Sequence, residues 1–191
     1  MTVNETDKTE LRRRFVDIQE SLLSAFENVY FLMGIEKALY NSSAPDLQAA
    51  TISHIQVNGY FSLIVTTHTL WDKGRNKSSI FRMLIDLEPY DKSMIKEARE
   101  KLERVKAVRL KVEDWRHNVI AHRTDKFHEV AKNKPLSLEE IEDLLLSYLD
   151  VMHDISHLVD ISVGNLHAIG NITEGHAHQL IESMTGRLPK S

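Results

Sequence analysis

The stretch from Ser93 to Arg123, SMIKEAREKLERVKAVRLKVEDWRHNVIAHR, decides the fold of this chain. Apolar residues recur in it at steps of three and four, which is the spacing of one face of an α-helix. Asp91 or Ser93 can cap the start of that helix. The pattern predicts one continuous helix to about His122, with an inward stripe of Met94, Ala98, Leu102, Val105, Val108, Val112, Trp115, Val119 and His122.

Arginines follow one edge of this predicted helix. Arg109, Arg116 and Arg123 recur every seven residues, so we expect a basic ridge beside the apolar stripe. The segment 96–126 holds ten Lys or Arg and six Asp or Glu, although the whole chain has a net charge of −4. A local basic excess is typical of solvated helices as well as of surfaces that bind anions.

Upstream, a second long helix is predicted from about Lys8 to Tyr40. Its apolar positions step by three and four, which again indicates one buried face. They are Leu11, Phe15, Ile18, Leu22, Ala25, Val29, Leu32 and Ile35.

Residues 51–71 allow two interpretations. The segment is rich in β-branched residues, and Asn58-Gly59 is a signal for a β-hairpin turn. Against this, Ile52, Ile55, Gly59, Leu63, Thr67 and Leu70 step by three and four, as in a helix. We favour the helix, with the hairpin as the alternative.

The remaining segments complete an all-α chain. A short helix is predicted over 78–87, and Ser137-Leu138-Glu139-Glu140 resembles a capping box that opens a helix to about Val163. We expect residues 1–8 to be disordered and 164–191 to form a short helix and a tail. The prediction is a single domain over 1–191, an up-and-down bundle of about five to six helices.

Composition narrows the class of protein. Hydrophobic residues make up 42% of the chain and charged residues 27%, which is typical of a globular domain. The absence of cysteine excludes disulfides and thiolate metal sites. Without a signal peptide or an apolar run of about 18 residues, we expect a cytoplasmic protein that does not enter a membrane.

The segment Trp115–Arg123, WRHNVIAHR, gathers side chains that suit phosphodiester chemistry. A guanidinium can bind phosphate oxygens, and an imidazole can transfer a proton near neutral pH. RNA carries its own nucleophile, the 2′-hydroxyl, so such a site needs no metal or cofactor. On an ideal helix Arg116 and His122 differ by about 240° in direction and ~9 Å in rise. They can meet at one phosphate only if the helix bends near Ile120 or a second copy contributes.

Two alternatives use the same kinds of residue for other purposes. Arginine and histidine near a helix end can simply interact with the helix dipole. His153 and His157 have the i, i+4 spacing of metal ligands, but they fall on the side of their helix opposite its apolar arc. For this pair we favour a solvated polar face.

Residues 116–123, RHNVIAHR, resemble the R-x(4–6)-H motif of the HEPN superfamily, small helical bundles that cleave or bind RNA. The polar residue after the arginine, His117, is usual in that motif. The AHR sequence after a hydrophobic pair and the preceding helix are most similar to the abortive-infection branch, which shuts down phage-infected bacterial cells. The resemblance rests on these eight residues and, more loosely, on the all-helical layout.

The resemblance implies a metal-independent endoribonuclease, working as a homodimer in antiviral defence. Arg116 and His122 would be catalytic, with His122 as general base or acid; the substrate-binding residues would be His117, Asn118, Arg109 and Arg123. RNA is the expected substrate, and an antitoxin protein is a further expected partner. Some relatives carry a tyrosine two residues after the motif histidine, which a partner enzyme modifies, whereas this chain has Thr124. The alternative function is a non-catalytic module that binds a nucleotide, nucleic acid or protein.

Overall fold

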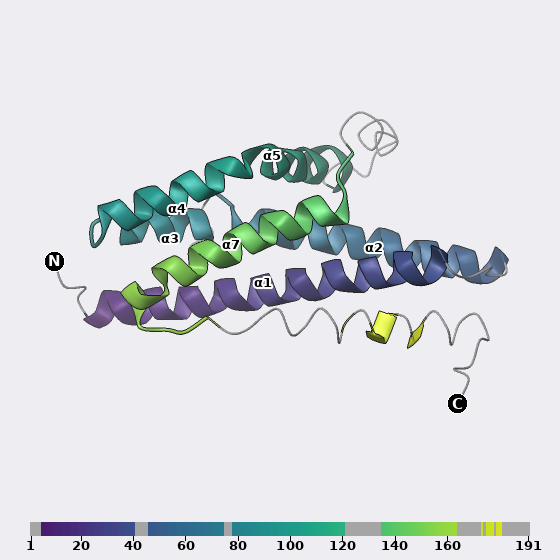
Figure 1. Ribbon diagram of the computed structural model, residues 1–191, viewed down its shortest axis with the longest axis horizontal. Helices are drawn as coiled ribbons and strands as arrows, with labels where there is room; N and C mark the ends of the chain where they lie inside the picture. Colours follow the sequence, from purple (N-terminus) through teal and green to yellow (C-terminus); the bar gives the residue numbers. More distant parts are fainter. Residues whose placement is uncertain are drawn as a thin grey trace.

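A computed structural model gives the architecture of the chain. It describes residues 5–40, 46–74, 78–120, 135–163, 173, 175–177, 179 and 180. These form a bundle of helices, as predicted (Figure 1). The elements in chain order are α1 (Glu5–Tyr40), α2 (Asp46–Leu70), α3 (Ile80–Leu87), α4 (Lys92–Arg104), α5 (Lys106–Trp115), the π-helical turn η1 (Arg116–Ile120) and α7 (Leu138–Val159).

Helix α7 holds the bundle together, since it contacts α1, α3, α4 and α5. Figure 1 shows α7 running between α1 on one side and the α4–α5 pair on the other. The long helices reverse direction from one to the next, as in an up-and-down bundle. Helix α2 packs against α1 and reaches α5 and η1, which brings its C-terminal end to the arginine-rich part of the chain.

Helix α1 confirms the predicted apolar face, because all eight stripe residues are buried. It begins at Glu5, within the segment 1–8 for which the sequence predicted disorder. Lys8 forms a salt bridge with Asp160 at the end of α7, and Arg12 donates hydrogen bonds to the Asp160 carboxylate and the Val159 carbonyl. These contacts fix the first turns of the helix.

The ambiguous segment 51–71 lies in a helix, α2, as we favoured. Gly59 marks a close approach of α2 to α1 instead of a hairpin turn. A Cβ atom at Gly59 would lie 2.9 Å from Cδ2 of Leu32. The glycine therefore lets two helices meet closely, which explains the misleading Asn58-Gly59 signal.

The continuous helix predicted from Ser93 to His122 is broken. Helix α4 ends at Arg104, and Val105 leaves helical geometry with φ −100° and ψ 10° before α5 begins. A π-helical turn, η1, replaces the α-helix from Arg116 onward. The residues that follow, 121–134, lie outside the described part of the chain. The buried residues keep the spacing of one helix face through this break; they are Ile95, Ala98 and Leu102 of α4 and Arg109, Val112 and Trp115 of α5.

Helix α7 begins at the predicted capping box. The Ser137 hydroxyl accepts from the Glu140 N–H, and the Glu140 carboxylate accepts from the Ser137 N–H. The helix ends at Val159, earlier than the predicted Val163, because Asp160 adopts the left-handed conformation with φ 52°. The predicted C-terminal helix lies largely outside the described residues; residues 173, 175–177, 179 and 180 are helical.

Among the described residues, no helix combines the length and the apolar character that crossing a bilayer requires.

Candidate functional site

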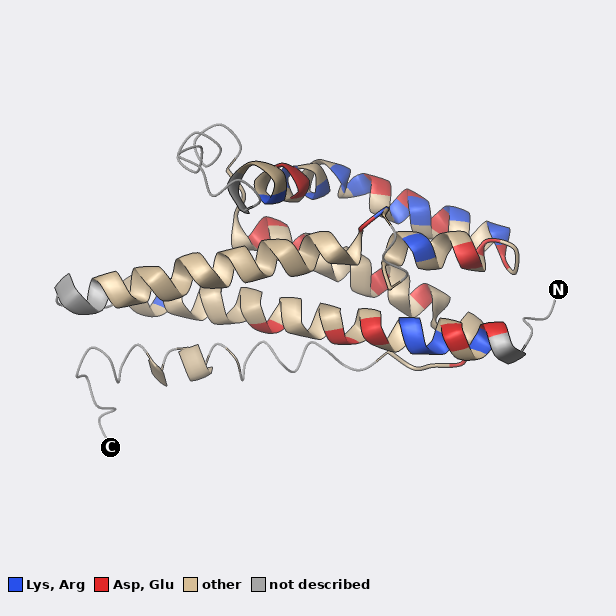
Figure 2. Ribbon diagram, turned by 180° about the vertical axis from the view of Figure 1, so that it is seen from behind, with Lys and Arg blue, Asp and Glu red and all other residues tan. Residues whose placement is uncertain are grey.

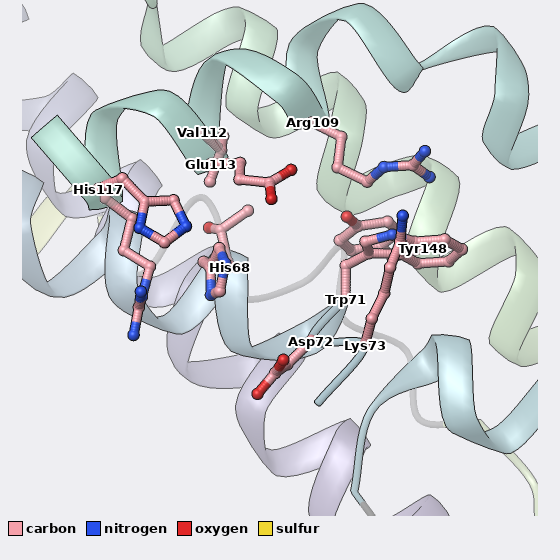
Figure 3. Close-up of a pocket in the computed structure, with 11 residues that line it drawn as sticks. His68, Trp71, Asp72, Lys73, Arg109, Val112, Glu113, His117 and Tyr148 are labelled. Atoms are coloured by element: carbon pink, nitrogen blue, oxygen red, sulfur yellow. The ribbon is translucent and has the colours of Figure 1, made fainter. Parts of the chain in front are cut away.

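A pocket of about 230 Å³ opens where the C-terminal end of α2 meets α5 and η1. Figure 3 shows His68 and His117 on one side and the stacked side chains of Arg109, Trp71 and Tyr148 on the other. Helix α2 and the segment after it, helix α5, η1 and α7 all contribute. The lining residues are Thr67, His68, Trp71, Asp72, Lys73, Arg109, Val112, Glu113, Arg116, His117 and Tyr148.

The motif arginine lines this pocket at the position where the helix type changes. Arg116 itself is still helical, with φ −58° and ψ −47°, and its N–H is shared between the carbonyls of Glu113 and Val112. The π-helical turn starts here, and such turns are rare and frequent at functional sites. Arg116 and His117 follow each other on this turn, and both line the pocket.

The predicted site residues separate into three groups. Arg116, His117 and Arg109 come together at the pocket. Asn118 is half-buried on η1 and is not among the lining residues. His122 and Arg123 lie outside the described residues. The predicted basic ridge is wrong for Arg109, which is buried on the same face of α5 as Val112 and Trp115.

His68 is the residue that sequence reasoning missed. Its ring meets the ring of His117 edge-on, with 6.2 Å between centroids and an interplanar angle of 81° (Figure 3). Burial, followed by the charge of Arg116, lowers the pKa of His68, and His117 adds to the effect while Asp72 and Glu113 oppose it. His68 is therefore mostly neutral at pH 7 and can accept a proton. Its only signal in the sequence is a histidine within the mostly apolar run of residues 60–71.

Arg109, Trp71 and Tyr148 form a stack on the other wall. The guanidinium carbon of Arg109 lies 4.2 Å from the centre of the Trp71 ring system. The Tyr148 ring stacks against Trp71, with 6.3 Å between ring centroids and an interplanar angle of 11°. Burial raises the pKa of the Tyr148 hydroxyl, which stays protonated as a hydrogen-bond donor.

Cations outnumber acids around the pocket. Lys73, Arg109 and Arg116 contribute three positive charges, and Asp72 and Glu113 two negative ones. Figure 2 shows that lysines and arginines gather on α4 and α5, whereas α2 is almost uncharged. The pocket thus lies between a charged helix and an apolar one, where its charges are only partly screened by solvent.

The histidine pair of α7 is placed differently. His153 and His157 are exposed, and the neighbouring Asp154 carboxylate forms a salt bridge of 2.7 Å with Lys101. Within the described ranges, no three His, Asp or Glu side chains are arranged to hold a metal ion. The pair belongs to the solvated face of α7, the reading favoured from the sequence.

Comparison with known proteins identifies one family. The family model described as HEPN_AbiU2, AbiU2, matches residues 8–180. This range includes every element described above from α2 to α7 and nearly all of α1. No curated protein and no solved structure matches the chain.

Proposed function

The chain belongs to the AbiU2 family of HEPN proteins, and from this premise we propose that it is a metal-independent endoribonuclease that acts as a toxin or abortive-infection effector. The supporting observation is the meeting of Arg116 and His117 from the motif with His68 from α2 at one basic pocket. Family membership by itself gives an abortive-infection HEPN module. The arrangement of these side chains is what favours cleavage of RNA.

Arg116 is the proposed phosphate-binding residue. Its guanidinium can bind the non-bridging oxygens of the scissile phosphate and stabilise the charge that grows on them as the 2′-oxygen attacks phosphorus. His117, Asn118, Arg109 and Arg123 are the proposed contacts to the rest of the RNA.

Two proton transfers complete the reaction. One imidazole removes the proton of the 2′-hydroxyl, and a second group returns a proton to the departing 5′-oxygen as the phosphorus–oxygen bond breaks. His122 is the proposed catalytic histidine from the motif. His68, neutral near pH 7, is the second imidazole available. The products would be a 2′,3′-cyclic phosphate and a 5′-hydroxyl.

A homodimer is part of the proposal, since a second copy would bring another Arg116 and His122 to a composite cleft. Light scattering of the purified protein should report twice the mass of the chain. If the protein stays monomeric at micromolar concentration, the proposed cleft between two copies does not form. An antitoxin protein that neutralises the effector is a further proposed partner.

Controlled expression in bacteria tests the enzyme directly. The unaltered protein should slow growth and fragment total RNA, and Arg116→Ala and His122→Ala should each abolish both effects. The matched control is Arg104→Ala, because Arg104 is an exposed arginine of α4 outside the pocket and its loss should leave the toxicity unchanged. Equal growth and intact RNA for all four folded proteins would overturn the proposal.

Binding without cleavage is the second candidate function. It is favoured by the stack of Arg109, Trp71 and Tyr148, which offers polar groups to a ligand but no imidazole. Chains that bind RNA or a nucleotide and leave it intact would support this candidate over the nuclease.

A further inference from the structure

Four polar atoms at the pocket are buried without a hydrogen-bond partner among the described residues. Each is closed to bulk solvent and has no hydrogen-bond partner within the described part of the chain. They are Thr67 Oγ1, Trp71 Nε1, Arg109 Nη1 and the Tyr148 hydroxyl, and all four residues line the pocket. Buried polar groups are almost always hydrogen-bonded, so four such atoms in one place point to a missing ligand.

Arg109 is the charged residue among these four. Its side chain is only 9% exposed, and its nearest carboxylate oxygen, on the exposed Glu103, lies 3.8 Å from Nη2. That distance is too long for a hydrogen bond. The contact with Trp71 holds the guanidinium in place but does not neutralise it. A buried charge without a close partner is costly, which favours an anion as its partner.

The chemistry of the four groups selects the same ligand. The guanidinium of Arg109 and the indole N–H of Trp71 can only donate, and the hydroxyls of Thr67 and Tyr148 can also donate. A ligand rich in acceptors and negatively charged satisfies such a set, whereas a cation or an apolar molecule does not. Lys73, which also lines the pocket, lies over the Phe81 ring at 5.8 Å and adds positive charge.

We propose that this wall of the pocket, formed by Thr67, Trp71, Arg109 and Tyr148, binds a phosphate group. The site is two helical turns before Arg116 on the chain, and it does not require that Arg116 cleaves RNA. The proposal rests on the RNA contact proposed above for Arg109 and names the phosphate group as the ligand of this wall, and phosphate binding can be measured whether or not the protein cleaves RNA. Inorganic phosphate and the phosphate of a nucleotide share this chemistry, and the experiment separates them.

The binding test uses the full chain without RNA. Inorganic phosphate, adenosine 5′-monophosphate and adenosine are titrated at constant ionic strength, followed by calorimetry and by the midpoint of thermal unfolding. Both phosphate compounds should bind saturably and raise the midpoint, because a ligand of the folded state stabilises it. Equal affinity for the two assigns the site to the phosphate group alone, and tighter binding of the nucleotide assigns it to a nucleotide. Binding of adenosine without any binding of phosphate would overturn the proposal.

Conservative variants connect the binding to these residues. Arg109→Met keeps the aliphatic stem against Trp71 and should weaken phosphate binding roughly tenfold or more, since hydrogen bonds to charged groups are the strong ones. Tyr148→Phe and Thr67→Val remove one hydroxyl each and should weaken it several-fold, while the ligand-free proteins stay as stable as the parent. Arg104→Met is the control outside the pocket.

Tyr148→Phe and Thr67→Val still test the proposal if Arg109→Met does not fold. An internal water would satisfy the same hydroxyls without any anion. In that case Tyr148→Phe would lower the unfolding midpoint of the ligand-free protein and leave phosphate affinity unchanged, which would contradict the proposal.

Discussion

Two arginines are buried among the residues that the structure describes, and their surroundings differ. Arg14 of α1 is 5% exposed and its Nη1 donates to an oxygen of Asp86 in α3 at 2.7 Å. Arg109 of α5 is 8% exposed, stacks on Trp71, and has Glu103 no nearer than 3.8 Å. The first arginine joins two helices of the core, and the second lies in the wall of a pocket.

Buried hydroxyls show the same difference between the two regions. Ser79, at the start of α3, donates to the carbonyl of Asp72 at 2.8 Å and accepts from the N–H of Arg82. Thr67, in the pocket wall, is equally buried and has no partner among the described residues. Nη1 of Arg14 and the Ser79 hydroxyl bond to groups of the bundle, whereas Thr67 Oγ1 and Arg109 Nη1 of the pocket wall have no partner among the described residues. Unsatisfied groups at a functional site cost stability that the rest of the fold supplies.

The largest effect is expected where a buried pair is broken. Asp86→Ala removes the acceptor of Arg14 and leaves its charge buried, so the free energy of unfolding should fall by about 3 kcal/mol. Urea denaturation followed by circular dichroism measures this loss. A change below about 0.5 kcal/mol would show that the Arg14 pair does not stabilise the core. The contrast drawn between Arg14 and Arg109 would then be wrong for Arg14.

A smaller loss of stability is expected at the N-terminal cap of α7, where both hydrogen bonds of the capping box are formed. Ser137→Ala removes the hydroxyl that accepts from the Glu140 N–H, and N-cap substitutions of this kind cost about 1 kcal/mol. The same denaturation experiment measures it. Ser147→Ala, on an exposed turn of the same helix, is the control and should change stability much less.

Among substitutions of charged residues, replacing Arg109 should change the free energy of unfolding least. Arg109→Met removes a favourable contact with Trp71 and, at the same time, an unpaired buried charge, so we expect a net change within about 1 kcal/mol in the absence of ligand. A loss as large as that of Asp86→Ala would mean that Arg109 is a structural residue, and the difference between the two arginines would disappear.

The smallest effect concerns pH. Burial first, and Arg116 next, lower the pKa of His68 in the folded protein below the ordinary value near 6.5. The unfolded chain binds a proton at this position more readily than the folded one, so stability is retained above about pH 6.5 and declines as the pH falls through the folded pKa. Asp72 and Glu113 raise the pKa of His68 and His117 lowers it, and all three residues are unchanged in the variant described next.

The His68→Gln variant measures this effect. Its urea midpoint should fall less between pH 7.5 and pH 5 than that of the parent protein. Identical slopes for the two proteins would show that His68 is not held in its neutral form.

The sequence was a good guide to the core and a partial guide to the site. Every predicted stripe residue of α1 is buried, because the periodicity of apolar residues is a local property. The predicted apolar arc of α7, which is Leu144, Leu145, Tyr148, Val151, Met152, Ile155 and Val159, is buried as well. The capping box at Ser137 was readable for the same reason. Local patterns therefore located most helices and their inner faces.

The rest depended on tertiary structure. The break at Val105 was hidden, because apolar residues continue through it at regular spacing. Arg109 meets Trp71, which directly follows α2, and lies in the same pocket wall as Tyr148 of α7, and no motif joins these residues in the sequence. His68 reaches His117 only because α2 packs beside η1.

Cleavage of RNA by the purified protein is the most direct test of the proposed function. A 5′-labelled RNA is incubated with the parent protein, Arg116→Ala and Arg104→Ala at pH 7 in the presence of EDTA. We expect fragments that end in a 2′,3′-cyclic phosphate, at equal rates for the parent and Arg104→Ala and about 100-fold more slowly for Arg116→Ala. Intact RNA with the folded parent protein, or equal cleavage by Arg116→Ala, would contradict the proposed function.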